Sequence, residues 1–119
     1  MYSILLVDDE PDLLAVWHLI LTGEGYDVRC ASNGAEALEC VRHRVPDLVI
    51  TDWMMPLMGG AELCRRMRAQ QDLASVPILV HTSAPLAQKT ENAWDVCLQK
   101  PVPMQLFLTT VGRLCAARG

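Results

Sequence analysis

The chain has no excess of positive charge. Its 10 Lys and Arg residues are outnumbered by 14 Asp and Glu residues, so its formal net charge is −4. Proteins that bind nucleic acid usually carry a basic patch or stripe that contacts the phosphates. We therefore expect this chain to bind neither DNA nor RNA.

The sequence also lacks any long apolar segment. No apolar run approaches the roughly 20 residues that a membrane-spanning helix needs, and residues 1–3 lead into a predicted strand without the basic segment or cleavage site of a signal peptide. We expect a soluble, cytoplasmic protein without membrane contact. With 119 residues, 51% of them hydrophobic, the chain is long enough to bury a core as one domain, residues 1–119, without disulfides.

The cysteines and histidines form no ligand or disulfide pattern. The five cysteines are widely separated and include no Cys-x-x-Cys pair, which favours small buried side chains in a reducing compartment. The three histidines are equally scattered, so we predict no zinc site. These residues are Cys30, Cys40, Cys64, Cys97, Cys115, His18, His43 and His81.

What the sequence does contain is two short apolar runs that each end in aspartate. Residues 4–7 precede Asp8 and Asp9, and residues 48–51 precede Asp52. Four consecutive apolar or β-branched residues are typical of a buried strand in a parallel sheet. These acids therefore lie at the carboxyl ends of strands, where open α/β sheets bind ligands.

The rest of the chain alternates between strand and helix patterns, such as Asn33 followed three residues later by Glu36, a helix-capping pair. Strands are predicted at 3–8, 26–31, 47–51, 76–81 and 96–99, and helices at 11–22, 34–44, 61–69, between 85 and 94, and at 103–116. Repeated alternation implies right-handed crossovers and a parallel sheet. We expect an α/β, flavodoxin-like, doubly wound five-stranded sheet of order 2-1-3-4-5 with five helices.

This strand order brings Asp8, Asp9 and Asp52 into one crevice, provided that the first strand ends near Asp8, because successive strand residues point to opposite faces. At about 4 Å and an effective dielectric constant of about 20, each pair of carboxylates repels by roughly 4 kcal/mol. A hard divalent cation with oxygen ligands, such as Mg²⁺, would offset that repulsion.

Two further residues, Thr82 and Lys100, follow strands at the same edge. A crevice with three carboxylates, a hydroxyl and an ammonium group suits a metal-bound phosphoryl group, and a carboxylate can act as the nucleophile. Taken singly, each residue also has a structural explanation: Asp8 as a helix cap, Thr82 as a satisfied hydroxyl and Lys100 as a solvated charge. The joint pattern favours the phosphoryl site.

With these residues the sequence resembles the receiver domain of two-component response regulators over essentially its whole length. The matching segments are Leu5-Leu6-Val7-Asp8-Asp9-Glu10-Pro11, Asp52-x-x-Met55-Pro56-x-x-x-Gly60, Thr82 and Lys100-Pro101. The resemblance implies a phosphorylation-controlled switch that catalyses only its own phosphoryl transfer and dephosphorylation and is otherwise not an enzyme. It implies a histidine kinase or a histidine phosphotransfer protein as the donor.

The resemblance also implies a role for each site residue. Asp52 accepts the phosphoryl group, Lys100 binds its oxygens and Thr82 moves toward them. Mg²⁺ is held by Asp9 and Asp52 directly, by Asp8 mainly through water, and by the backbone carbonyl of Met54. The Lys100-Pro101 peptide is a candidate for the cis form.

The sequence departs from the family pattern in two places. Eighteen positions separate Thr82 from Lys100, about four fewer than usual, or one helical turn, so we expect the helix between 85 and 94 to be short, irregular or mobile. Cys97 stands where receivers usually carry an aromatic ring that rotates as the hydroxyl moves, which puts that coupling in question.

Three residues near the site bear on the rate of dephosphorylation. Met54, two after Asp52, and Ala84, two after Thr82, occupy positions where polar side chains in the family help to orient attacking water. Ser83 replaces a smaller residue and narrows access to the phosphoryl group. We hypothesise that spontaneous dephosphorylation is slow for this family.

Two surface features are ambiguous. Segment 11–22 is apolar over more than the usual stripe of about 100°, which indicates either a deeply packed helix or a docking or dimer surface that includes Leu14. Arg65, Arg66 and Arg68 are predicted to form a solvated face. The apolar residues of that segment are Leu13, Leu14, Val16, Trp17, Leu19, Ile20 and Leu21.

Two other functions stay open. A small Mg²⁺-dependent phosphatase also uses a strand-end aspartate, but it usually carries a second acid two residues later, where this chain has Met54. A pseudo-receiver that binds partners without phosphorylation is favoured by the altered 85–94 segment but not by the intact acids. Because the sequence ends soon after its last predicted helix, we expect a single-domain regulator or a receiver from a longer protein.

Overall fold

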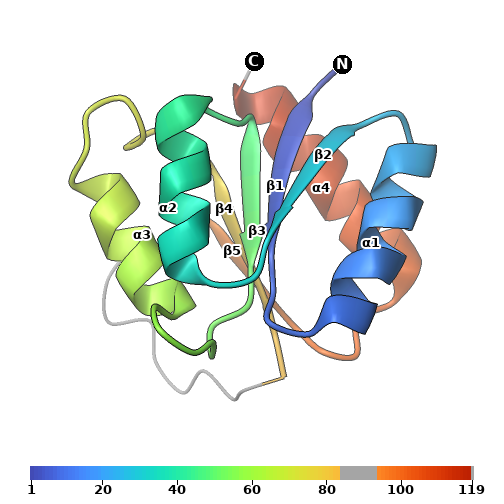
Figure 1. Ribbon diagram of the computed structural model, residues 1–119. Coiled ribbons are helices and arrows are strands. Elements are labelled where there is room, and N and C mark those ends of the chain that lie inside the picture. Colours follow the sequence, from blue (N-terminus) through green and yellow to red (C-terminus); the bar gives the residue numbers. More distant parts are fainter. Residues whose placement is uncertain (84–93, 119) are drawn as a thin grey trace.

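The computed structural model describes residues 1–83 and 94–118, which form one five-stranded sheet with helices on both faces (Figure 1). All strand pairs are parallel and the order is β2-β1-β3-β4-β5, as predicted. The strands are β1 (Ser3–Val7), β2 (Asp27–Ala31), β3 (Leu48–Thr51), β4 (Ile78–Thr82) and β5 (Val96–Gln99). The helices of the described part are α1 (Pro11–Gly23), α2 (Gly34–His43), α3 (Gly60–Arg68) and α4 (Met104–Arg118). The helix predicted between 85 and 94 lies outside the described residues.

The predicted boundaries agree with the structure to within two residues. The backbone N–H of Glu36 donates to Asn33 Oδ1 at 2.9 Å, which confirms the predicted cap of α2. The strand β4 begins at Ile78 rather than at residue 76, because the Val76 N–H is used in a turn and Pro77 has no N–H to donate.

The sheet separates two hydrophobic clusters, because successive residues of a strand face opposite sides. Helices α2 and α3 cover one face, and α1 and α4 cover the other (Figure 1). Helix α3 contributes Leu63, Cys64 and Met67 to the first cluster. Helix α4 contributes Phe107, Val111, Leu114, Cys115 and the partly buried Leu108 to the second cluster.

Helix α1 packs most of its apolar residues against the second cluster. Trp17 and Leu21 are buried, and Leu13, Leu14 and Ile20 pack against the cluster at partial burial. Leu14, which the docking interpretation singled out, is therefore a packing residue. The large apolar side chains that α1 leaves exposed are Val16 and Leu19.

Arg68 is not part of a solvated face, which corrects the prediction for this residue. Its guanidinium donates to the carbonyls of Ala74 and Val76 at 3.0 and 2.7 Å and pairs with Asp95 at 2.9 Å. The tip of Arg68 reaches the segment before β4 because α3 ends beside it. Arg65 and Arg66 are exposed and pair with Glu62 on the same helix.

The cysteines are all free, but they are not uniformly buried. Cys64 and Cys115 are buried, Cys40 and Cys97 are half-buried, and Cys30 is exposed on β2. The prediction of small buried side chains is therefore wrong for Cys30, because β2 is an edge strand of the sheet. Among the described residues, no helix has the length and apolar character that crossing a membrane requires.

Candidate functional site

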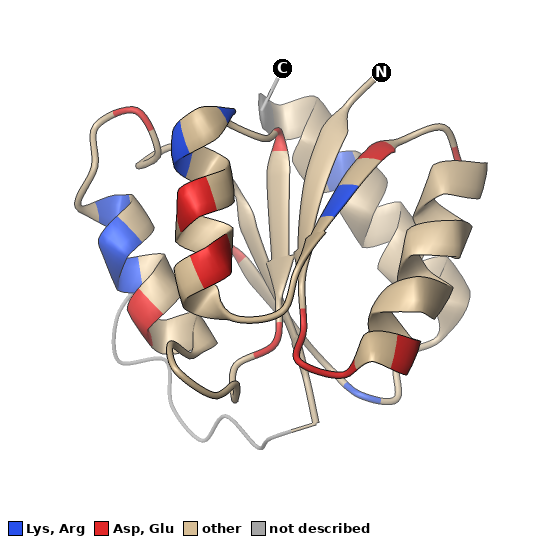
Figure 2. Cartoon of the chain, viewed as in Figure 1, with Lys and Arg blue, Asp and Glu red and all other residues tan. Residues whose placement is uncertain are grey.

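The three aspartates predicted to share a crevice do so. Val7 and Thr51 are paired across β1 and β3, so Asp8 and Asp52 follow directly at the same edge of the sheet. One carboxylate oxygen from each of Asp8, Asp9 and Asp52 lies within 4.8 Å of the others. Figure 2 shows acidic residues in red directly after β1 and β3, at the edge of the sheet where these strands end. Both acids after β1 reach the crevice because that strand ends at Val7.

Two of the three acids are almost fully buried. Asp8 is 5% exposed and Asp52 is 6% exposed, whereas Asp9 is exposed. Burial in a medium of low dielectric constant strengthens the mutual repulsion of carboxylates. This edge of the sheet therefore requires positive charge close to Asp8 and Asp52.

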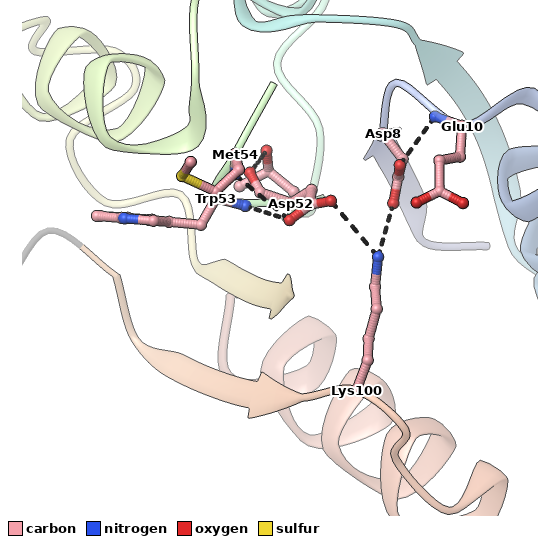
Figure 3. A network of polar contacts seen from close by, with 7 residues as sticks. Asp8, Glu10, Asp52, Trp53, Met54 and Lys100 are labelled. Atoms are coloured by element: carbon pink, nitrogen blue, oxygen red, sulfur yellow. Dashed lines mark hydrogen bonds and ion pairs between the residues drawn. The ribbon is translucent and has the colours of Figure 1, made fainter. Parts of the chain in front are cut away.

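Lys100 supplies that charge from the loop after β5. Its Nζ lies 3.1 Å from Asp8 Oδ2 and 3.5 Å from Asp52 Oδ2 (Figure 3). Only 16% of the Lys100 side chain is exposed, so its interpretation as a solvated surface charge is wrong. The Lys100-Pro101 peptide is cis, as predicted.

The two oxygens of each buried acid have different partners. Asp52 Oδ1 accepts hydrogen bonds from the backbone N–H groups of Trp53 and Met54 at 2.7 and 3.4 Å, and Oδ2 faces Lys100 (Figure 3). Asp8 Oδ1 accepts from the Glu10 N–H at 3.0 Å, while Oδ2 faces Lys100. Asp8 thus both stabilises the turn into α1 and belongs to the acidic site.

Thr82 ends β4 beside this group. It is 1% exposed, and its carbonyl accepts a hydrogen bond from the Lys100 N–H at 2.8 Å. Thr82 and Lys100 are therefore held together through the backbone of neighbouring strands. Of the other residues singled out, Ser83 and Met54 are exposed, Cys97 is half-buried on β5, and Ala84 lies outside the described residues.

Close backbone contacts fix the loop between β3 and α3. A Cβ atom on Gly60 would lie 2.4 Å from the Asp52 carbonyl oxygen, and one on Gly34 would lie 2.6 Å from the Met58 carbonyl oxygen. Only glycine permits such approaches. The end of the loop at Gly60 therefore packs closely against the backbone of Asp52, and Met58 of the loop packs closely against Gly34 at the start of α2.

The loop also contains an exposed residue in an uncommon conformation. Leu57 has φ of 66° and is 89% exposed, and the Met58 N–H donates to the Pro56 carbonyl at 2.8 Å. A left-handed backbone is uncommon for a bulky non-glycine residue. The tight turn therefore holds the Leu57 side chain out in solvent.

His81 is a site neighbour that the sequence analysis did not identify. It is 5% exposed, and with Trp17 it lines a cavity of about 10 Å³ that Asp8 and Asp52 also line. Burial, and then the nearby Lys100 ammonium, lowers the pKa of His81 to about 4. Because side chains two apart on a strand point to the same face of the sheet, the sequence could have shown that His81 shares the face of Leu79 and not that of Val80.

The acidic site is well suited to a divalent cation. Three carboxylates in mutual reach form an oxygen donor set, and hard cations such as Mg²⁺ bind oxygen ligands. In this group of three described residues every ligand is a carboxylate oxygen, and none is a thiolate or an imidazole. The donor chemistry thus agrees with the predicted ion.

Comparison with known proteins agrees with this arrangement. The sequence profile described as "Response regulator receiver domain" matches residues 4–111. The chain belongs to the response regulator receiver domain family. It is therefore a receiver domain of the two-component signal transduction class, with the flavodoxin-like fold that the sequence predicted.

Individual relatives extend this result. The receiver domain is 42% identical over 113 residues to the DNA-binding response regulator MtrA of Mycolicibacterium smegmatis. The aligned residues make up 93% of this chain and 50% of MtrA. The chain thus spans about half the length of that curated relative.

Among solved structures, it resembles the receiver domain of a signal transduction histidine kinase from Syntrophus aciditrophicus, with a TM-score of 0.91, 30% identity, and coverage of 98% and 92% of the two chains. It also resembles response regulator TrrA of Thermotoga maritima in complex with Mg²⁺-BeF, with a TM-score of 0.87, 30% identity, and coverage of 96% and 99%.

Proposed function

We propose that this receiver domain is a phosphorylation-controlled switch in which Asp52 accepts a phosphoryl group from a phosphohistidine. The observation that carries the proposal is the placement of Lys100 Nζ 3.1 Å from Asp8 and 3.5 Å from Asp52, within a group of three carboxylates. A buried carboxylate beside an ammonium group and a metal-binding acid pair is equipped for phosphoryl transfer.

The reacting atom is Asp52 Oδ2. Its partner oxygen, Oδ1, is engaged by backbone N–H groups, whereas Oδ2 faces Lys100. Oδ2 attacks phosphorus, the P–N bond to the donor histidine breaks, and the imidazole keeps the electron pair and takes up a proton. The donor is a histidine kinase or a histidine phosphotransfer protein.

Lys100 changes partner during this transfer. In the unphosphorylated domain its ammonium offsets the charges of Asp8 and Asp52. After transfer it pairs with a phosphoryl oxygen through a charge-assisted hydrogen bond, and the Thr82 hydroxyl, at the end of the neighbouring strand, donates to another oxygen. Asp8, Asp9, Asp52 and the carbonyl of Met54 would hold Mg²⁺, which neutralises the phosphoryl oxygens when bound.

The added group carries about −1.5 to −2 charges in place of one carboxylate. It changes partner binding only by interacting differently with two states of the domain. Retention of the phosphoryl group is prolonged because neither Met54 nor Ala84 carries a polar side chain that could orient water. The signal then passes to a downstream protein partner.

The test is incubation of the full chain with Mg²⁺ and a small phosphodonor, followed by intact-mass measurement. One stable added phosphoryl group, lost in Asp52→Asn and retained in Asp12→Asn, is the expected result. Asp12 is the matched control because it is an exposed acid in the first turn of α1, outside the group of three. Multiple turnover of the donor would indicate a phosphatase instead, and an unchanged mass would indicate a phosphorylation-independent pseudo-receiver.

A further inference from the structure

A second cavity lies beside the acidic site, on the face of the sheet that α1 and α4 cover. Its volume is about 270 Å³. Figure 1 shows the loop before α4 next to the N-terminal end of α1, and the cavity opens between them. We call it the α1–α4 groove; its lining residues are Leu13, Trp17, His81, Lys100, Pro101 and Val102.

His81 contributes a polar side chain to the lining of the groove. Its ring packs against Trp17 and Phe107, with centroid distances of 5.7 and 4.9 Å. Within the described part of the chain, no group forms a hydrogen bond with the His81 imidazole, although buried polar groups are generally hydrogen-bonded. The His81 imidazole can therefore form a hydrogen bond with a molecule in the groove.

The nitrogens of His81 reach open space rather than packed atoms. No side-chain nitrogen or oxygen among the described residues is both fully enclosed and without a partner. His81 lines both the 10 Å³ cavity at the acidic site and the much larger groove. Because the smaller cavity holds at most one water, the groove is the place where a ligand can meet the imidazole.

The groove offers little charge to a ligand. The ammonium of Lys100 is directed to Asp8 and Asp52 (Figure 3), and burial keeps His81 neutral. A neutral imidazole presents one donor and one acceptor nitrogen. The remaining lining is the Trp17 ring, the aliphatic side chains of Leu13 and Val102, and Pro101.

The volume limits the size of the occupant. The groove has a volume of about 270 Å³. It is smaller than the roughly 300–1,000 Å³ of pockets for drug-sized ligands. One aromatic ring system with a short polar substituent matches this space.

We propose that the α1–α4 groove binds a small, uncharged aromatic molecule with one hydroxyl or N–H group, of the phenol or indole class. Its ring lies against Trp17, and its polar group bonds to His81. This site does not depend on phosphorylation of Asp52.

The test is an NMR titration of the unphosphorylated full chain with phenol and, separately, with indole. The three tryptophans give three indole N–H signals, assigned with single Trp→Phe variants. The Trp17 signal is expected to shift and saturate, while the signals of Trp53 and Trp94, which pack on the opposite face of the sheet, stay in place. Unsaturated shifts, or equal shifts of all three signals, overturn the proposal.

Variants separate the hydrogen bond from simple apolar binding. His81→Leu is expected to weaken phenol binding roughly fivefold, as loss of one neutral hydrogen bond does, without weakening the binding of toluene, which lacks the hydroxyl. Val102→Trp fills the groove and is expected to abolish binding of both probes. Leu106→Ala, an exposed position outside the groove, is the matched control and leaves both affinities unchanged. Equal affinities for phenol in His81→Leu, Val102→Trp and the unmodified chain overturn the proposal even if one variant is poorly folded.

Discussion

The indole ring of Trp53 meets that of Trp94 edge-on, with ring centroids 5.0 Å apart and ring planes at 78°. Trp53 directly follows Asp52, and its backbone N–H donates to Asp52 Oδ1. Trp94 lies two residues before β5. The aromatic pair thus joins the loop that follows the central acid to the start of the strand that leads to Lys100.

Removing Trp94 should destabilise the domain. Trp94 is 9% exposed, and truncation of a buried tryptophan to alanine typically costs about 3–5 kcal/mol. Urea unfolding of Trp94→Ala measures this loss, and Trp94→Phe, which keeps a ring, should lose less. A cost for Trp94→Ala below about 0.5 kcal/mol, the usual range of surface substitutions, would show that the pair contributes little.

Gly60→Ala should disturb the acidic site and stability together. The new Cβ would lie 2.4 Å from the Asp52 carbonyl oxygen, so the backbone of Asp52 must move, at a cost of about 1–3 kcal/mol. Phosphorylation by a small donor should slow as well. Gly23→Ala is the control, because no atom lies within 4 Å of its added Cβ. Equal behaviour of the two variants would contradict the close contact.

Asp9→Asn should stabilise the domain when no divalent cation is present. It removes one of three carboxylates within 4.8 Å of one another, and relief of repulsion at an exposed position amounts to roughly 1 kcal/mol or less. Added Mg²⁺ should stabilise the unmodified chain more than the variant, because the variant has lost a ligand. Thermal unfolding with and without Mg²⁺ checks both effects. A Mg²⁺ response that is identical in the two proteins would exclude Asp9 as a ligand.

Stability should fall in acid partly through His81. Burial lowers the pKa of His81 to about 4 in the folded state, against an ordinary value of 6.5. Between these pH values the unfolded chain binds a proton at His81 that the folded chain does not, so the free energy of unfolding decreases as the pH falls from about 6.5 to 4, by up to about 3 kcal/mol. Above pH 6.5 this contribution is constant.

The His81 contribution can be isolated by difference. The carboxylates titrate in both proteins, so the free energy of unfolding of His81→Leu minus that of the unmodified chain should increase as the pH is lowered from 7.5 to 4.5. Urea unfolding at several pH values gives this difference. If it stays constant with pH, His81 is protonated equally well in the folded and unfolded chains.

Met54→Asn should accelerate loss of the phosphoryl group from Asp52. Met54 is 66% exposed beside Asp52, and an amide at this position can orient an attacking water, which the thioether cannot. The decay of the phosphorylated mass with Mg²⁺ present measures the rate. Leu57→Asn, on the same loop but farther along the chain, is the control. An unchanged or slower decay in Met54→Asn would show that this side chain does not set the lifetime of phosphorylated Asp52.

The sequence predicted the acidic site because its geometry follows from local rules. Apolar runs of four residues mark buried strands, and a parallel sheet with β1 beside β3 necessarily brings Asp8 and Asp52 to one edge. The same reasoning placed Lys100 at the end of β5. Its ion pairs with two acids could not be derived from the sequence, since Lys100 alone is compatible with a solvated charge.

Contacts that depend on tertiary packing were missed. Arg68 and Asp95 are 27 positions apart and meet only because α3 ends beside β4 and β5. His81 follows an apolar run, and nothing in the sequence indicates that Trp17 and Phe107 enclose its ring. The left-handed backbone of Leu57 was equally hidden, because residues other than glycine seldom adopt it.

The ion pair between Lys100 and Asp8 spans 92 positions of the chain. The first strand and the last strand must therefore both be in place before the central acid acquires its positive neighbour. A nascent or truncated chain that stops short of Lys100 carries the three aspartates without their lysine. Such a fragment would lack the complete acidic site. The domain would therefore be able to signal only after the entire sheet has been synthesised and folded.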